Sequence, residues 1–263
     1  MTHAHLACHL ADGIAYIDMD RADLHNAFDE VLIQGLTAAI AGYANDASVR
    51  AVVLTGRGPS FSAGADMNWM RRMASASEDA NRADAEALAT LMRTLAYCPK
   101  TTIARINGSA FGGGVGLIAC CDIAVTVDSA KFALTETKLG LVPAVISPYV
   151  MDAIGLRQAR RYFQTAELFD AARAQQIGLV HEVVSADALD ETVARVLKAL
   201  SKTGPVATGE AKALALRMAD RNESAQRLID AENARLIARL RVSAEGQEGL
   251  SAFLDKRAPS FAL

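Results

Sequence analysis

Three consecutive glycines, Gly112 to Gly114, stand where an apolar strand pattern changes into an apolar helix pattern, within INGSAFGGGVGL (106–117). Glycine has no Cβ, so a ligand can approach these backbone amides closely. The first amides of a helix have no partner inside the helix, and the helix dipole favours an anion beside them. The segment predicts a site for a negatively charged oxygen, although a glycine-rich turn that packs a helix on a strand would have the same pattern.

A second segment of this kind lies upstream, in AVVLTGRGPSFSAGAD (51–66). A buried-type strand pattern ends in a turn around Gly56 and Gly58, and a loop of small residues at 61–66 precedes a helix pattern. Two loops that follow two strands can each direct one backbone N–H at the same point. An oxyanion hole requires two such donors, and loss of one costs about 3 kcal/mol of transition-state stabilisation.

Neither loop has the sequence of a nucleotide-binding site. The G-x-G-x-x-G pattern fails because Leu117 stands where the third glycine is required, and the chain has no GK[ST] of a phosphate-binding loop. The two loops therefore predict stabilisation of an oxyanion.

Glu136, in LTETKLGL (134–141), is the candidate proton-transfer group. Its neighbours are largely apolar or hydroxylic. Partial burial would raise its pKa from about 4.3 toward the working pH, as general acid–base catalysis requires. The alternative is a solvated glutamate at a helix start that pairs with Lys138, and the local sequence alone does not separate the two.

The elements that must position these residues alternate along the chain. Strands are predicted at 5–10, 14–19, 49–55, 102–106, 123–127 and 180–184, and helices at 28–43, 78–96, 113–120 and 156–163. Strands that alternate with helices imply an α/β fold with buried parallel pairing. From about residue 187 the strand pattern disappears, and amphipathic helices that require partners are predicted at 190–200, 205–218, 225–240 and 244–254.

Composition limits the function classes. The 263 residues, 51% hydrophobic, can bury a substantial core as one large domain or a domain with an appendage. A net charge of −3 gives no electrostatic reason to expect nucleic acid as a partner. Without a signal-peptide pattern or an apolar run long enough to span a bilayer, the expected location is the cytoplasm, with no membrane partner.

The cysteines and histidines do not form the pattern of a metal site. The four cysteines lack metal-site spacing, and Cys120 and Cys121 are expected to be small buried thiols. His3, His5 and His9 alternate on a predicted strand, but no carboxylate cluster accompanies them. We therefore expect no metal site.

The whole chain resembles the crotonase, or enoyl-CoA hydratase/isomerase, superfamily, and six ordered segments between residues 61 and 257 carry the resemblance. They are FSAGAD (61–66), INGSAFGGG (106–114), ACCDIAV (119–125), AKFALTETKLGLVP (130–143), AQQIGLVHEVV (174–184) and EGLSAFLDKR (248–257). The resemblance implies a right-handed spiral of ββα units at 1–200 that holds an acyl-CoA site. It also implies a C-terminal helical region at 201–263 that joins subunits into a homotrimer or homohexamer. The implied substrate is a coenzyme A thioester, without a prosthetic group.

The resemblance assigns roles residue by residue. The oxyanion amides of the family fall on Ala65 and Gly113, with the thioester oxygen between them, and its catalytic glutamate falls on Glu136. Most hydratases of the family carry a second glutamate where this chain has Gly116, so one carboxylate must perform the proton transfers. A single carboxylate can add water syn across a double bond or can move the double bond. A hydratase, a 3-enoyl-CoA isomerase and a non-catalytic acyl-CoA-binding protein therefore remain alternatives.

The same comparison implies the residues near coenzyme A. They are His25, Ala27, Arg57, Ala63, Asp66, Phe253 and Lys256. Phe253 and Lys256 would reach the coenzyme A of a neighbouring subunit. By residue type alone, Asp66 and Asp122 are expected to cap helices or bond nearby amides, and Trp69 either lines the acyl pocket or belongs to the core.

Further segments indicate the acyl group. They are GADMNWM (64–70), FGGGVG (111–116), PAVISPYV (143–150) and RRYFQTAELFDA (160–171). They resemble bacterial methylglutaconyl-CoA hydratases of leucine breakdown and their relatives in acyclic terpene breakdown. The implied substrate is a branched enoyl-CoA with a distal carboxylate. Candidates for binding that carboxylate are Arg71, Arg72, Arg105, Ser147 and Tyr149.

Overall fold

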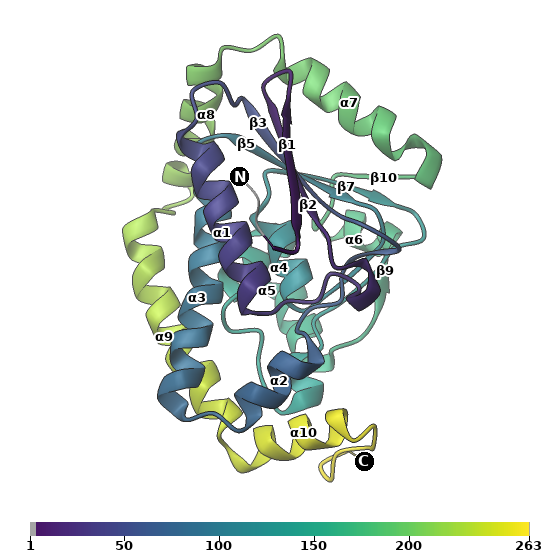
Figure 1. Cartoon of the computed structure of the whole chain (residues 1–263), viewed down its shortest axis with the longest axis vertical. Helices are drawn as coiled ribbons and strands as arrows, with labels where there is room; N and C mark the ends of the chain where they lie inside the picture. The colour runs from purple at the N-terminus through teal and green to yellow at the C-terminus, as the bar shows by residue number, and fades with distance from the viewer. Residues whose placement is uncertain (1–3, 263) are drawn as a thin grey trace.

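Two sheets form the centre of the protein, for which a computed structural model describes residues 4–262 (Figure 1). The larger sheet contains, in spatial order, β1 (Leu6–Ala11), β2 (Ile14–Met19), β3 (Ala51–Gly56), β5 (Thr101–Ile106), β7 (Ile123–Val127) and β10 (Glu182–Val184). β1 and β2 are antiparallel, and all other neighbours in this sheet are parallel. Every residue of β3 is buried, as expected for a central parallel strand covered on both faces.

The smaller sheet consists of β4 (Ser60–Ser62), β6 (Ser109–Phe111), β8 (Lys131–Ala133) and β9 (Phe169–Asp170). β4, β6 and β8 each follow a strand of the larger sheet along the chain, and the pairs β3–β4, β5–β6 and β7–β8 are each succeeded by helical structure. The predicted α/β class with repeated strand–strand–helix units is confirmed. The sequence patterns missed the small sheet, because strands of two or three residues are too short to show a period of two.

Between residues 4 and 200 the chain forms seven α-helices. They are α1 (Glu30–Asn45), α2 (Met67–Ala74), α3 (Glu78–Ala96), α4 (Gly113–Cys120), α5 (Ser147–Thr165), α6 (Ala171–Gln176) and α7 (Leu189–Leu200), with 3-10 turns η1 (Ala22–Leu24), η2 (Glu136–Leu139) and η3 (Ala186–Ala188). Side chains of Asp29, Ser77 and Asp170 cap three of these helices by accepting a backbone N–H.

Helix α5 is longer than the predicted segment 156–163. It begins at Ser147, has Pro148 in its first turn, and is interrupted at Gly155, which has a φ of 75°. Proline is tolerated in a first turn because its missing N–H has no intrahelical partner there. The prediction missed the first half because Gly155 interrupts the helical periodicity.

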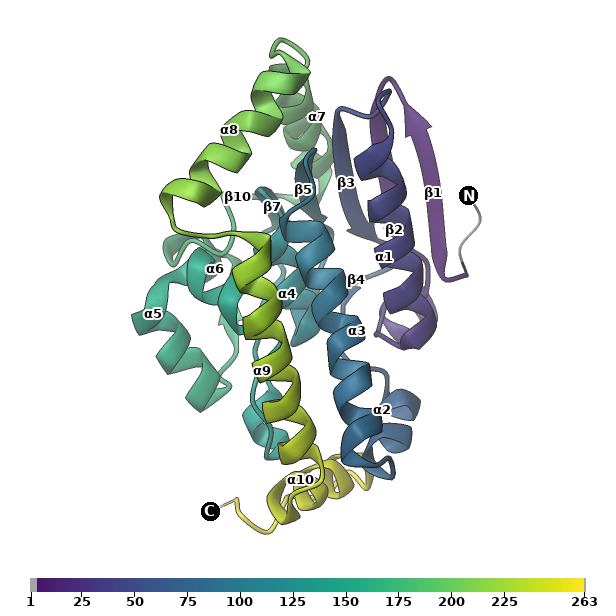
Figure 2. The ribbon, with the colours of Figure 1, turned by 90° about the vertical axis from the view of Figure 1, so that its left-hand side faces the viewer.

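The C-terminal helices are α8 (Pro205–Met218), α9 (Glu223–Arg241) and α10 (Ala244–Leu254). Figure 2 shows α9 lying along α3, while α10 crosses the end of the molecule and contacts α2 and η2. Two buried ion pairs join α3 to α9, Arg93 with Asp230 and Asp84 with Arg241. Helices α9 and α10 therefore complete the same body that carries the cavity described below, whereas α8 buries none of its residues.

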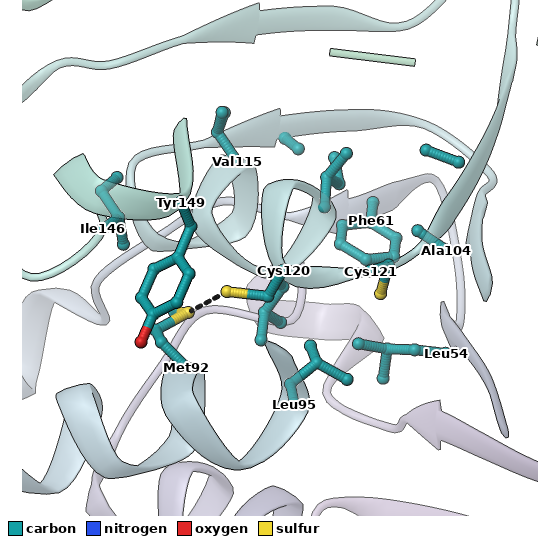
Figure 3. Close-up of a cluster of buried hydrophobic side chains, with 14 of the residues drawn as sticks. Leu54, Phe61, Met92, Leu95, Ala104, Val115, Cys120, Cys121, Ile146 and Tyr149 are labelled. Carbon is teal, nitrogen blue, oxygen red and sulfur yellow. Dashed lines mark hydrogen bonds between the residues drawn. The ribbon is translucent and has the colours of Figure 1, made fainter. Parts of the chain in front are cut away.

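A dense apolar core surrounds α4 (Figure 3). Cys120 and Cys121 are buried in it, and the Cys120 Sγ lies 3.7 Å from the Met92 Sδ. Burial raises the pKa of both thiols, so they remain protonated, as expected for structural cysteines. The Tyr149 ring belongs to the same core, next to Met92 and Cys120.

The remaining expectations concern metal and membrane. His3 lies outside the described residues, His5 is 3.9 Å from Asp29, and His9 stacks on Tyr16. Between residues 4 and 262, no group of three or more His, Cys, Asp or Glu side chains is arranged to hold a metal ion. No helix in this range combines the length and the apolar character needed to cross a bilayer.

Candidate active site

A cavity of about 380 Å³ lies between the two loops at 63–65 and 111–113, the η2 turn, and helices α2, α3, α9 and α10. Most side chains around it are apolar. The charged residues that border it are Glu136, Lys138 and Arg241. A concave, mostly apolar space with a few polar groups is typical of a small-molecule site.

The loop after β4 presents the Ala65 amide. Gly64 has a φ of 84°, and a Cβ at that position would lie 2.9 Å from the Phe111 carbonyl oxygen. Phe28 fixes both sides of Ala65, because its N–H donates to Gly64 O (2.6 Å) and its carbonyl accepts from the Asp66 N–H (2.8 Å). Within residues 4–262 the Ala65 N–H donates to no protein group, so it remains available to a ligand.

The loop after β6 presents the Gly113 amide at the start of α4. Gly112 precedes it with a φ of 49° and donates its N–H to Ala133 O (3.0 Å). A Cβ on Gly113 would lie 2.5 Å from the Phe28 ring, so no larger residue fits without moving that ring. In the described part of the chain the Gly113 N–H also has no acceptor. The two residues predicted to form an oxyanion hole thus border one cavity, and Phe28 lies against both of their loops.

Glu136 begins η2 and borders the same cavity. Its Oε1 would lie 3.2 Å from a Cβ on Gly112, which places the carboxylate beside the glycine loop. Its Oε2 is buried and makes no hydrogen bond to any described residue. Burial raises the Glu136 pKa to about 7. Lys138 is exposed and forms no ion pair with a described residue, so the alternative of a solvated Glu136–Lys138 pair is wrong.

Gly116 is buried in α4, with no room for a side chain. A Cβ there would lie 2.3 Å from the Ile146 Cγ2 and 3.3 Å from the Met92 Cε. Ile146 itself borders the cavity. Apolar atoms therefore fill the position from which a second glutamate would start.

Asp66 and Asp122 are structural, as expected from their residue type. Asp66 caps α2 by accepting the Asn68 and Trp69 N–H groups at 2.8 and 3.0 Å. Asp122 accepts the Thr102 N–H at 2.8 Å and pairs with Lys212 at 2.9 Å. The Asp66 backbone is also engaged within the protein, so this coenzyme A candidate does not face the cavity.

The other coenzyme A candidates are only partly brought together. Ala63 and Phe253 border the cavity, and the His25 carbonyl accepts the Ala63 N–H at 2.8 Å. Arg57 lies away from the cavity and pairs with Asp20 at 2.7 Å.

The last two candidates for binding coenzyme A are Ala27 and Lys256. Ala27 is buried and Lys256 is exposed beyond α10, and neither borders the cavity. Phe253 borders the cavity of its own chain, and its contact with the coenzyme A of a neighbouring subunit stays a prediction.

None of the five residues offered for a distal carboxylate borders the cavity. Arg72 pairs with Glu30, Arg105 pairs with Asp190, Arg71 bonds Asn68, Ser147 donates to Ala144 O, and the Tyr149 hydroxyl is buried in the core without a partner among residues 4–262. These residues lie near the right segments of the sequence, but their side chains do not reach the cavity.

Sequence reasoning missed Arg241, which borders the cavity at the end of α9. Its Nη1 donates to Asp84 Oδ2 at 2.7 Å and to Asn81 Oδ1 at 3.2 Å. The available signal was its spacing from Ile237, because residues four apart share one face of a helix and both border the cavity.

Trp69 both belongs to the core and lines the cavity. It is 3% exposed, its ring lies 5.8 Å from the Arg241 guanidinium carbon, and its Nε1 donates to Asp84 Oδ1 at 2.8 Å. Burial raises the pKa of Asp84, and Arg241 and Trp69 oppose that rise by bonding the ionised form.

Comparisons with known proteins show what this chain is similar to. Residues 9–262 match the family described as enoyl-CoA hydratase/isomerase. The 2,3-dehydroadipyl-CoA hydratase of Escherichia coli (strain K12) is 31% identical over 94% of this chain and 94% of its own length.

Two solved structures show the extent of the likeness. The crystal structure of an enoyl-CoA hydratase from Shewanella pealeana superposes with a TM-score of 0.79 at 43% identity, covering 98% of this chain and 96% of that one. An enoyl-CoA hydratase from Bacillus halodurans gives a TM-score of 0.89 at 25% identity, covering 95% and 100%. The expected crotonase-type fold is confirmed.

Proposed function

Because this chain belongs to the enoyl-CoA hydratase/isomerase family, we propose that it adds water to an enoyl-CoA, with Glu136 as the acid and base and the Ala65 and Gly113 amides as the oxyanion hole. The observation that carries the proposal is a buried carboxylate bordering the same cavity as two backbone amides, where neither the carboxylate Oε2 nor the two N–H groups bond any residue between 4 and 262.

The proposed reaction requires one carboxylate. Ionised Glu136 removes a proton from water, and the water oxygen bonds to C3 of the enoyl group. The electron pair of the C2–C3 double bond moves into the thioester, whose oxygen becomes an enolate bonded by the Ala65 and Gly113 N–H groups. Protonated Glu136 then delivers a proton to C2 on the same face. The sum is syn addition of one water molecule, and Glu136 returns to its ionised form.

Isomerisation of a 3-enoyl-CoA is the second candidate, supported by the apolar Gly116–Ile146 contact. A hydratase that binds water between two carboxylates would require a second acid there. An isomerase requires only that Glu136 remove a proton from C2 and return it to C4. The two candidates differ in whether solvent oxygen enters the product.

For the acyl group we propose a branched glutaconyl-type thioester such as 3-methylglutaconyl-CoA. Support comes from the segments that resemble methylglutaconyl-CoA hydratases and from a relative named for 2,3-dehydroadipyl-CoA, whose acyl chain also ends in a carboxylate. The place of such a reaction in leucine or acyclic terpene breakdown is part of the same proposal.

We also propose that residues 201–263 contribute to a homotrimer or homohexamer. Helix α8 buries none of its residues, and three apolar side chains on it, Val206, Leu214 and Met218, are exposed. A second copy of the chain would remove this apolar surface from water.

The test is turnover of 3-methylglutaconyl-CoA, crotonyl-CoA and a 3-enoyl-CoA in water enriched in ¹⁸O, analysed by mass spectrometry. We expect loss of enoyl absorbance and one labelled oxygen in the product of the native chain. A shifted double bond without label would establish the isomerase. Binding of acyl-CoA without turnover of any of the three would favour the non-catalytic alternative.

A further inference from the structure

On one side of the cavity a single arginine, Arg241, lies in an otherwise apolar wall. Arg241 borders the cavity among Trp69, Met73, Leu88 and Ile237. Its side chain is 13% exposed and that of its partner Asp84 is 8% exposed. Figures 1 and 2 show that α2, α10 and the C-terminal end of α9 gather at this end of the molecule.

The hydrogen bonds of Arg241 use only one of its nitrogens. Nη1 donates to both Asp84 and Asn81. Among residues 4–262, no acceptor is within bonding distance of its Nε or Nη2. Nε–H and Nη2–H lie on one edge of the guanidinium, and that edge matches the two oxygens of a carboxylate.

The residues around Arg241 hold it in place. Asp84 is fixed by the Trp69 Nε1–H, and the Asn81 amide is itself bonded to the carbonyls of Met73 and Ala76. The Trp69 ring packs against the guanidinium. An arginine held in this way loses little conformational freedom when it binds a ligand.

We propose that Arg241 is the residue that recognises a carboxylate at the far end of the acyl group, with Asp84 and Trp69 as its positioning residues. This inference rests on the proposed function, because it assumes an acyl-CoA in the cavity. It replaces the five candidates named from the sequence, none of which borders the cavity. The proposal also separates two classes of substrate. An unbranched apolar acyl chain would offer no acceptor to the Nε–H and Nη2–H groups of Arg241, whereas an acyl chain that ends in a carboxylate would.

A structural ion pair is the competing explanation, and the chain contains a matched control for it. Arg93 and Asp230 form a second buried pair between the same two helices, with side chains 10% and 6% exposed. Neither residue borders the cavity. If Arg241 only fastens α9 to α3, replacement of either pair will have the same consequences.

The experiment compares two pair-neutralised variants of the full chain, Arg241→Gln/Asp84→Asn and Arg93→Gln/Asp230→Asn. Calorimetric titration with glutaryl-CoA and butyryl-CoA measures binding without turnover, since both are saturated. We expect the native chain to prefer glutaryl-CoA. We expect that preference to fall about 10- to 100-fold in the Arg241 variant, as for a lost bond to a charged group, and to persist in the Arg93 variant.

Kinetics add a second readout. The ratio of kcat/KM for 3-methylglutaconyl-CoA to that for crotonyl-CoA is expected to fall by a similar factor in the Arg241 variant, mainly through a higher KM for the acidic substrate. Arg241→Lys retains the charge, loses the paired N–H edge, and is expected to give an intermediate ratio. It also serves as the test if the double variant fails to fold.

Three results would overturn the proposal: equal affinity of the native chain for both analogues, an unchanged ratio without Arg241, or the same fall in the Arg93 control. A native chain that prefers glutaryl-CoA but hydrates no enoyl-CoA would support the role of Arg241 while overturning the proposed hydratase activity.

Discussion

The Glu136 turn and the Gly116–Ile146 contact border the same cavity but bring opposite chemistry to it. At the first, a carboxylate is buried with one oxygen unpartnered within residues 4–262 and a pKa raised to about 7. At the second, a glycine and an isoleucine leave only apolar atoms. The comparison indicates that, of these two regions, only Glu136 can transfer a proton.

The two regions also differ in how they tolerate change. Glu136 is desolvated and pairs with no cation in the described part of the chain, which is typical of a group kept for proton transfer. Gly116 lies in a tightly packed contact, where the cost of change is steric. Substitutions in the two regions should therefore affect different properties, activity in the first and stability in the second.

The largest effect is expected from Glu136→Gln, which preserves shape and removes the proton-transfer group. We expect kcat to fall about 10²- to 10⁴-fold, the range typical of a general acid–base residue. Steady-state hydration assays measure the effect. Glu182→Gln is the control, because Glu182 is half-buried, pairs with Arg195 and lies away from the cavity. Equal rates in the native chain and Glu136→Gln would remove Glu136 from the mechanism.

Gly113→Ala should have the next largest effect, because its Cβ would lie 2.5 Å from the Phe28 ring and would displace the amide. Loss of an oxyanion donor lowers kcat about 10²- to 10³-fold, and we expect the lower end of that range because the N–H is moved and not deleted. Gly204→Ala is a suitable control, since its Cβ would meet only Ala207, at 3.7 Å. A wild-type kcat in Gly113→Ala would exclude this amide as a donor.

The pH profile should follow the Glu136 carboxyl group. Water addition requires the ionised form, and burial raises the pKa of Glu136 to about 7. We expect kcat/KM to be constant above that pH and to fall about tenfold per unit below it. Initial rates from pH 5 to 9 would measure the midpoint. A midpoint near the ordinary glutamate value would mean that the carboxylate is solvated in the free enzyme.

The sequence predicted the parts of this site that depend on short local patterns. The glycines at 112–114 and the small residues at 61–66 marked the two loops, and the apolar surroundings of Glu136 indicated its burial. The order of strands and helices predicted the α/β class, because periodicity is strong in segments of five or more residues. The same patterns could not reveal the two- and three-residue strands of the small sheet.

Local sequence patterns could not predict contacts between residues that are far apart in the sequence. Arg241 was missed because it lies 105 positions from Glu136 in sequence (241 − 136) and reaches the cavity only when α9 packs along α3. Arg71, Arg72 and Arg105 were closer to the motifs, but their side chains meet partners on other faces. Which face of an element meets the cavity is decided by tertiary packing, and one chain's residue types do not specify it.

The smallest effect on the reaction is expected at Gly116. Gly116→Ala would place its Cβ 2.3 Å from the Ile146 Cγ2, so we expect the free energy of unfolding to fall by about 1–3 kcal/mol, as for an overpacked core. Urea denaturation measures this loss, and Ile146→Ala in the same chain should recover part of it by making room. Gly116→Glu/Ile146→Ala then offers a second carboxylate to the cavity. If Glu136 alone completes the proton transfers, kcat in that variant will not exceed the native value; a tenfold gain would mean that the native reaction is not the hydration for which one carboxylate suffices.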